Sequence, residues 1–228
     1  ADGDSICVAK KPEVSDFNQV AIDKGEAAKE TALLRAEKFG HSVHVIDPFN
    51  ICDVPDELKG RFNPLDELDM ESLQAREDIL ALTDGMIMRH DSRDEFWNSG
   101  GETILAGTIA YVAAMADPAN RHLQEVRRIF DLGQDEFTDL LEDEFQHVHA
   151  AGNLALETYA LATKTPKQWD SFYGTANDST KWLNSPAMAQ IMQDSTFRMS
   201  DLKTKPTTVY LVIPAEYLGT HGRFLRLF

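Results

Sequence analysis

The chain has 228 residues, 43% of them apolar, which is enough for one large domain or two modest ones with a sizeable core. Its formal net charge of −16 argues against a generic nucleic-acid binder, which usually presents a basic face, although DNA contacts can still lie on a local patch. The two cysteines, Cys7 and Cys52, are far apart and form no ligand pair, which indicates a reducing compartment rather than a secreted disulfide scaffold.

Neither end of the sequence has the signals of a natural terminus. No signal peptide follows Ala1, and no apolar run approaches the ~18 residues that span a bilayer. The first residue is not Met, and the chain stops at Arg226-Leu227-Phe228, inside an apolar and basic helical pattern. We therefore expect a fragment of a longer protein.

The first predicted region, residues 1–60, contains a strand, a helix and a second strand. The apolar run Val20–Ile22 stops at Asp23, a helical pattern covers Ala27–Phe39, and the β-rich run Ser42–Ile46 stops at Asp47. This order implies a parallel sheet. Both strands end in an acidic residue, at the edge where open α/β sheets place ligands. Residues 1–18 have no assignment.

The second region, residues 61–203, is predicted to be an all-helical inserted domain. Between residues 61 and 200 it has 24 Asp and Glu against 11 Lys and Arg, a net charge of −13. Turn-forming pairs such as Asp117-Pro118, Gly152-Asn153 and Thr165-Pro166 separate its helices. The helical patterns cover Met70–Met88, Asp94–Met115, Leu123–Phe130, Asp135–Val148, Leu154–Leu161, Trp169–Leu183 and Ala187–Met192.

The third region, residues 204–228, returns to the sheet. The run Thr208–Ile213 is β-branched and aromatic, as in a buried strand, and Pro214 ends it. Residues Glu216–Phe228 are predicted to form a helix. The predicted fold class is α/β, with a sheet domain that an all-α domain interrupts between two strands.

No phosphate-binding loop is present in the sequence. No Gly is followed directly by Lys, so the pattern G-x-x-x-x-G-K-[ST] does not occur, and G-x-G-x-x-G is missing too. The chain therefore offers no phosphate cradle of its own.

Asp23-Lys24-Gly25-Glu26, at the end of the first strand, is the candidate functional segment. Asp23 and Glu26 could orient water or a metal beside a phosphate that a neighbouring loop holds. Lys24 could offer positive charge, and Gly25 allows a sharp backbone turn. The alternative is an ordinary strand-to-helix turn, with Glu26 favoured by the helix dipole.

Other catalytic patterns are weak. Glu144 and His147 have the spacing of carboxylate-bridged metal sites, but such sites need a second Glu-x-x-His, which the sequence lacks. A solvated acidic helix face explains these residues better, and a metalloenzyme is only a third hypothesis. No nucleophile elbow is present. We assign no catalytic residue and no metal ligand.

Several stretches in order, over about residues 19–228, resemble the TraG/TraD-like coupling proteins of type IV secretion. The family has a strand ending in Asp-Pro-Lys-Gly-Glu, followed by a helix with Thr-Ala and an Arg. Here Asp23-Lys24-Gly25-Glu26, without the Pro, precedes Thr31-Ala32 and Arg35. Further matching stretches are Gly40–Phe49, Arg61-Phe62-Asn63-Pro64-Leu65-Asp66, Phe96-Trp97 with the helix through Tyr111, Ser200-Asp201-Leu202-Lys203 with Pro206, and Arg226-Leu227.

The resemblance implies a RecA-like P-loop NTPase domain that an all-helical domain interrupts. The parent protein would be anchored in the bacterial inner membrane by an N-terminal segment, form a hexameric ring on the cytoplasmic face, and use ATP with Mg²⁺. It would move single-stranded DNA, with its attached relaxase, towards the secretion channel proteins. Asp23, Lys24, Gly25 and Glu26 would then lie near the nucleotide edge or a subunit boundary.

The resemblance also implies that this chain is inactive alone. The Walker A motif should lie upstream of the first strand, and the Walker B motif should lie beyond Phe228. We therefore expect no cofactor for this chain by itself. The alternative function is a non-enzymatic module, whose acidic helical domain binds a basic protein with a steep dependence on salt.

Overall fold

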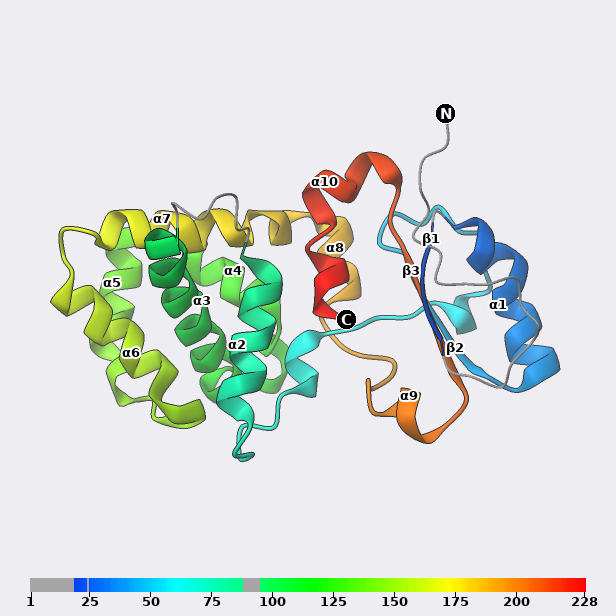
Figure 1. Ribbon diagram of the computed structural model, residues 1–228, viewed down its shortest axis with the longest axis horizontal. Coiled ribbons are helices and arrows are strands. Elements are labelled where there is room, and N and C mark those ends of the chain that lie inside the picture. Colours follow the sequence, from blue (N-terminus) through cyan, green and yellow to red (C-terminus); the bar gives the residue numbers. More distant parts are fainter. Residues whose placement is uncertain (1–18, 24, 88–94) are drawn as a thin grey trace. The chain divides into compact units, whose positions relative to one another are not determined.

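The computed structural model describes residues 19–23, 25–87 and 95–228 (Figure 1). These residues form two compact units. The first, here called the sheet unit, lies within Ala1–Asn63 and Pro186–Arg226, with Phe228. The second, the helical unit, is Pro64–Ser185, with Leu227. The expected boundaries at 60/61 and 203/204 differ from these: residues 186–203 belong to the sheet unit.

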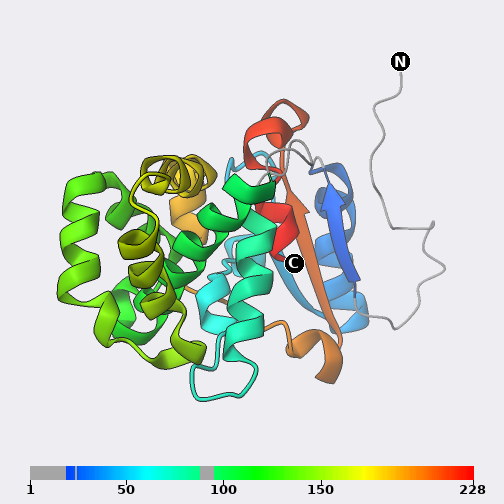
Figure 2. The same ribbon diagram turned by 60° about the vertical axis from the view of Figure 1, so that its left-hand side comes forward.

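The sheet unit contains three parallel strands, β1 (Gln19–Asp23), β2 (Ser42–Ile46) and β3 (Thr207–Val212). Their order is β1-β3-β2, so the last strand in the sequence lies between the first two (Figures 1 and 2). Val45 and Ala21 both align with Tyr210 of β3. The whole of β3 is buried, as its β-branched and aromatic run predicted. The helical unit is inserted between β2 and β3.

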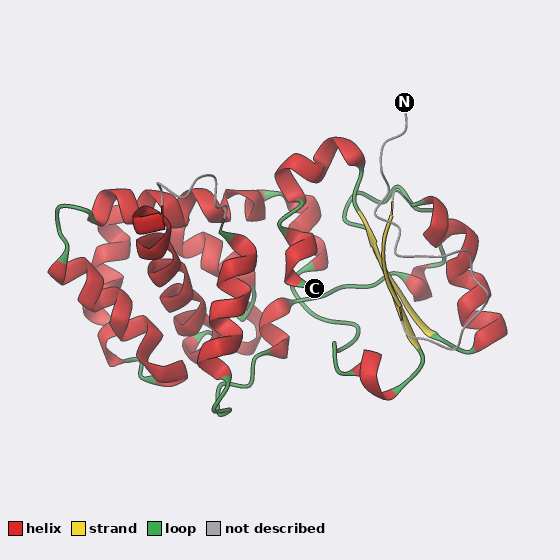
Figure 3. Ribbon diagram, viewed as in Figure 1, coloured by secondary structure: helices red, strands yellow, loops and turns green. Residues whose placement is uncertain are grey.

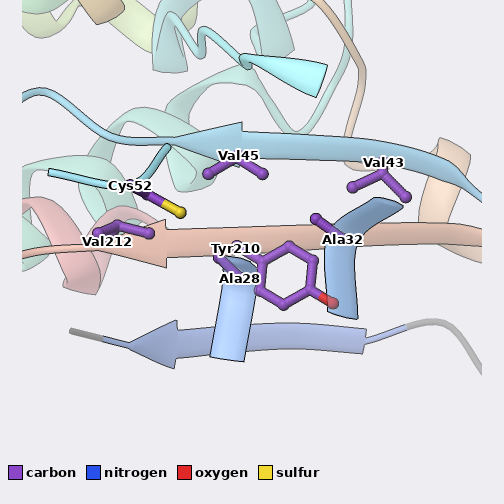
Figure 4. Packing of buried hydrophobic residues seen from close by; sticks show 7 residues of the cluster. All are labelled: Ala28, Ala32, Val43, Val45, Cys52, Tyr210 and Val212. Carbon is purple, nitrogen blue, oxygen red and sulfur yellow. The ribbon is translucent and has the colours of Figure 1, made fainter. Parts of the chain in front are cut away.

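Helix α1 (Glu26–Phe39) covers one face of this sheet. Its small residues Ala28 and Ala32 allow close packing on Val43 and Val45 of β2 and on Tyr210 and Val212 of β3 (Figure 4). Cys52 joins the same cluster. The helix ends at Gly40 in a left-handed conformation (φ 65°), and the Gly40 N–H donates to the Arg35 carbonyl.

Aromatic residues from distant segments cover the opposite face. Phe197 stacks on His44 of β2 (ring centroids 4.8 Å apart) and on Phe62 (5.5 Å). The Phe62 N–H also donates to the Ile191 carbonyl (2.8 Å). These contacts tie α8 (Pro186–Ile191) and the segment that follows it, up to α9 (Asp201–Thr204), to the sheet unit. The boundary between the units therefore lies before α8, at 185/186.

The chain after β3 forms short turns rather than the single helix expected over residues 216–228. The segments are η7 (Ala215–Tyr217), α10 (Leu218–His221) and η8 (Phe224–Leu227). Gly219 and Gly222 lie within this stretch, and glycine is a poor residue for a helix interior.

The helical unit is built around α3 (Glu95–Met115), which packs against α2 (Ala75–Met86), α6 (Ala150–Lys164) and α7 (Trp169–Thr180) (Figure 3). Apolar residues lie on most sides of α3, as expected of a central helix. The other segments are η2 (Pro64–Glu67), η4 (Pro118–Asn120), α4 (Leu123–Asp131), α5 (Gln134–Asp143), η5 (Phe145–His147) and η6 (Lys181–Asn184).

Within the described ranges, none of the helices combines the length and the apolar character that a membrane crossing requires.

Candidate functional site at the carboxyl edge of the sheet

The carboxyl ends of the three parallel strands meet at one edge of the sheet. Asp23, the last residue of β1, aligns with Val212 of β3, and Ile46 of β2 aligns with Leu211. The loops that leave these strands therefore gather at the edge where open α/β sheets bind ligands.

Gly25 forms the turn from β1 into α1. Its φ of 98° and ψ of −16° lie in the left-handed region, where glycine carries no steric penalty. It is buried, and a Cβ there would lie 3.6 Å from Val212 Cγ1 and 3.7 Å from Cys52 Cβ. The Gly25 carbonyl accepts from the Cys52 thiol (3.3 Å) and from the Lys29 N–H (3.0 Å).

The structure describes the other three residues of the candidate segment in different detail. The backbone of Asp23 ends β1 at the carboxyl edge. Lys24 lies outside the described residues. Glu26 is the first residue of α1, and its side chain is exposed. A role for these residues beside a nucleotide stays a prediction.

Asp47, the acidic residue after β2, shapes the loop that follows it. Its Oδ1 accepts from the Phe49 N–H (3.2 Å) and its Oδ2 accepts from the Cys52 N–H (2.6 Å). Asn50 lies between these donors with a φ of 51°. The carboxylate thus holds the turn that brings Cys52 against Gly25.

A cavity of about 400 Å³ lies beside this loop, within the sheet unit. Its volume is in the range of small-molecule sites. The residues that line it are Val45, Asp47, Pro48, Asn50, Cys52, Val54, Lys59, Gly60, Arg61, Gln190 and Ile191.

The two cationic residues of this cavity already have carboxylate partners. Lys59 Nζ lies 2.7 Å from Asp56 Oδ1, and the hydrogen bond raises the pKa of Lys59. Arg61 donates two hydrogen bonds to Asp194 (2.6 and 2.9 Å), which lower the pKa of the Asp194 carboxyl. An anion entering here would have to compete with Asp56 and Asp194. The cavity is therefore not a prepared phosphate site.

An aromatic cluster at the same edge was not predicted from the sequence. Phe49, after β2, packs on Tyr217 (ring centroids 4.5 Å apart) and on His221 (5.4 Å), both after β3. His221 is 8% exposed, and its Nδ1 has no hydrogen-bond partner among the described residues. Burial lowers the pKa of His221. No motif marks this residue in the sequence.

The Glu144 and His147 pair does not lie on one helix. Helix α5 ends at Asp143, and Glu144 has non-helical backbone angles (φ −126°, ψ −48°), which breaks the helix expected over Asp135–Val148. The Tyr111 hydroxyl donates to Glu144 Oε2, and burial together with this bond raises the pKa of Tyr111. In the part of the chain that the structure describes, no three His, Cys, Asp or Glu side chains gather as a metal site.

Two comparisons with known proteins agree with one another. The family model described as "Type IV secretory system Conjugative DNA transfer" matches residues 15–228. The chain is also similar to "Probable conjugal transfer protein TraG" of Sinorhizobium fredii (strain NBRC 101917 / NGR234), with 26% identity over 219 residues. That alignment covers 84% of this chain and 33% of the relative, so the chain spans about a third of the relative's length.

Proposed function

Because the chain belongs to the conjugative DNA transfer family of the type IV secretory system, we propose that it is a segment of a coupling protein. The parent protein would be an ATP-driven hexameric pump that delivers relaxase-bound DNA to the conjugation channel. The observation that supports this proposal most is the parallel sheet interrupted between β2 and β3 by a helical unit. This is the organisation that the resemblance to coupling proteins implies.

The sheet unit would be part of the RecA-like nucleotide-binding domain of the parent, which would use ATP and Mg²⁺. The chain itself contributes strands and the carboxyl edge but no Gly-Lys pair for a phosphate loop. Asp23, Lys24, Gly25 and Glu26 would lie near the nucleotide or at a subunit boundary. The parent would act at the cytoplasmic face of the inner membrane, held by an N-terminal segment.

The complete protein encoded around this segment provides the test. We expect this chain alone to bind ATP negligibly by calorimetry, whereas the complete protein hydrolyses ATP in the presence of single-stranded DNA. Asp23→Asn and Glu26→Gln in the complete protein should each reduce hydrolysis by roughly tenfold, because both carboxylates would orient groups around the transferred phosphate.

Glu30→Gln is the matched control, since Glu30 is also exposed on α1 but one turn further from the edge. Tight, Mg²⁺-dependent ATP binding by this chain alone would contradict the proposal. Full activity of the Asp23 and Glu26 variants would show that these two residues have no role in ATP hydrolysis, but it would not contradict the proposed family function.

A second candidate function rests on the charge of the helical unit. Residues 64–185 have 23 Asp and Glu against nine Lys and Arg, a net charge of −14. Such a surface would attract a basic protein, such as a relaxase, without any enzymatic role. Binding should weaken steeply as salt is raised, because added ions screen exposed charges. Affinity that does not change with salt would argue against this role.

A further inference from the structure

The loop that leaves β2 is anchored by its first residue, Asp47. Both carboxylate oxygens accept from main-chain N–H groups further along the loop, Oδ1 from Phe49 (3.2 Å) and Oδ2 from Cys52 (2.6 Å). The Asn50 N–H also donates to the Asp47 carbonyl (3.3 Å), and Asn50 adopts a φ of 51°, a conformation that asparagine tolerates better than most residues. The position of Cys52 therefore depends on this one aspartate.

Cys52 in turn contacts the turn between β1 and α1. Its thiol donates to the Gly25 carbonyl (3.3 Å), which also accepts from the Lys29 N–H (3.0 Å) in the first turn of α1. Cys52 is 3% exposed and belongs to the buried cluster between α1 and the sheet (Figure 4). A Cβ at Gly25 would lie 3.7 Å from Cys52 Cβ and 3.8 Å from Ile51 Cδ1, so side chains of this loop pack directly against the turn.

Gly25 is the point at which these contacts reach the candidate functional segment. Asp23 ends β1 shortly before it, and Glu26 begins α1 directly after it. Because each residue has only two free backbone dihedral angles, a carbonyl that is held in place restricts the backbone on both sides of it. The contacts that run from Asp47 through Cys52 to Gly25 thus fix the backbone beside both candidate residues.

We propose that Asp47 and Cys52 are positioning residues for ATP hydrolysis in the parent protein. Their part is to hold the turn at Gly25, so that Asp23 and Glu26 meet the transferred phosphate in the correct geometry. The inference rests on the proposed function and adds two residues from the end of a second strand to its site. The effect is large in principle, because misplacing a catalytic group by about 1 Å can cost about a hundredfold in rate.

The first test measures the coupling in the 228-residue chain, without nucleotide. In a Cys7→Ser background Cys52 is the remaining thiol, and its rate of reaction with an aromatic disulfide reagent reports how often the loop opens. Asp47→Ala should speed this reaction about tenfold or more, because it frees the loop that buries the thiol. Asp53→Ala is the matched control. It removes an exposed carboxylate next to Cys52 that accepts none of these hydrogen bonds, and it should change the rate less than about twofold.

The second test uses the complete protein and separates the hydrogen bond of Cys52 from its packing. Cys52→Ser and Cys52→Ala both lose the sulfur atom, but only serine keeps a donor for the Gly25 carbonyl. If Cys52 positions the turn, the serine variant should have a kcat about fivefold higher than that of the alanine variant. A role in packing alone predicts no difference or the reverse order, because burying a hydroxyl is costly where burying a methyl group is not.

Asp47→Ala in the complete protein should lower kcat, expressed per bound nucleotide, about tenfold with little change in the KM for ATP. Asp53→Ala should keep the wild-type kcat. Wild-type thiol protection in Asp47→Ala, or a kcat of Cys52→Ser no higher than that of Cys52→Ala, would overturn the inference, while ATP hydrolysis by the wild type would leave the proposed function intact. If the complete wild-type protein does not hydrolyse ATP, the proposed function fails and the positioning role fails with it.

Discussion

Gly25 is the residue at the candidate site whose backbone conformation matters most. At a φ of 98° an L-residue is strained by contact between its Cβ and the backbone, although the surrounding space would admit a methyl group 3.6 Å from Val212. Gly25→Ala should therefore destabilise the sheet unit by about 1–2 kcal/mol. Hydrogen exchange of the β3 amides measures this loss in the intact chain.

Gly219→Ala is the control for Gly25, because Gly219 lies in the same unit without a positive φ and with open space around it. We expect it to change the stability by less than about 0.5 kcal/mol. Equal effects of the two substitutions would show that the left-handed turn at Gly25 carries no particular cost.

His221 should make the stability of the sheet unit depend on pH. Burial lowers its pKa from the ordinary value of 6.5, so His221 binds a proton less readily in the folded protein than in the unfolded chain. The corresponding stability is present above pH 6.5 and is lost as the pH falls through that value towards the lower pKa of the folded state. In His221→Phe this part of the pH dependence should disappear from the exchange rates of the β3 amides.

Two features keep the His221 measurement specific. His44, whose pKa is lowered by burial and by Lys205, acts in the same direction but is present in both proteins. The amides of the helical unit serve as an internal control in the same samples. An identical pH slope in the sheet unit of wild type and His221→Phe would refute the assignment.

Among single residues, the sequence predicts the features that depend only on residue type and on near neighbours in the chain. The turn at Gly25, the stop of α1 at Gly40 and the acidic ends of β1 and β2 follow from residue type and neighbours. The bond from the Cys52 thiol to Gly25 spans 27 residues, and the packing of His221 on Phe49 spans the whole helical insertion. Neither contact leaves a pattern in the sequence, because each depends on how distant segments meet at the sheet edge.

Helices α3 and α6 pack closely at Gly107. A Cβ at Gly107 of α3 would lie 2.0 Å from Thr158 Oγ1 and 2.8 Å from the Leu154 carbonyl oxygen of α6. Because the carbonyl belongs to the helix backbone, the two helices would have to separate. Gly107→Ala should therefore cost about 1–3 kcal/mol, the usual range for overpacking a core.

Tryptophan fluorescence during urea unfolding measures this effect within the helical unit, since Trp97, Trp169 and Trp182 all lie there. Gly174→Ala in α7 is the control. That glycine has open space around it and no positive φ, so alanine should be neutral or stabilise by up to about 1 kcal/mol. A Gly107→Ala protein as stable as Gly174→Ala would contradict the close packing.

The element predictions succeed where residue types favour one element and a Gly or Pro ends it, and they fail where a helix must end for tertiary reasons. The helix over Ala27–Phe39 and the strand over Thr208–Ile213 match α1 and β3 within a residue or so at each end. The helix over Asp135–Val148 is wrong beyond Asp143. There the chain turns at Glu144 and buries Phe145, which stacks on Tyr111 (4.5 Å), a contact with a helix far away in the sequence.

For the whole molecule, the parallel arrangement of the sheet is confirmed, since a helical crossover between two strands implies it. The position of β3 between β1 and β2 could not be predicted, because strand order depends on the return of the chain after the helical insertion. The same holds for residues 186–203. A helical pattern over Ala187–Met192 assigned them to the helical domain, but contacts of Ile191 with Phe62 and of Phe197 with His44 place them in the sheet unit.

We propose that this chain, a member of the conjugative DNA transfer family, is the middle segment of an ATP-driven coupling protein. Sequencing the DNA that flanks the codons for Ala1 and Phe228 tests it most directly. We predict an open reading frame with a Gly-Lys-[Ser/Thr] phosphate loop upstream of Gln19, and with an apolar strand ending in Asp-Glu downstream. Stop codons close to both ends would contradict the claim, and the acidic helical unit would then stand as a protein-docking module without ATPase activity.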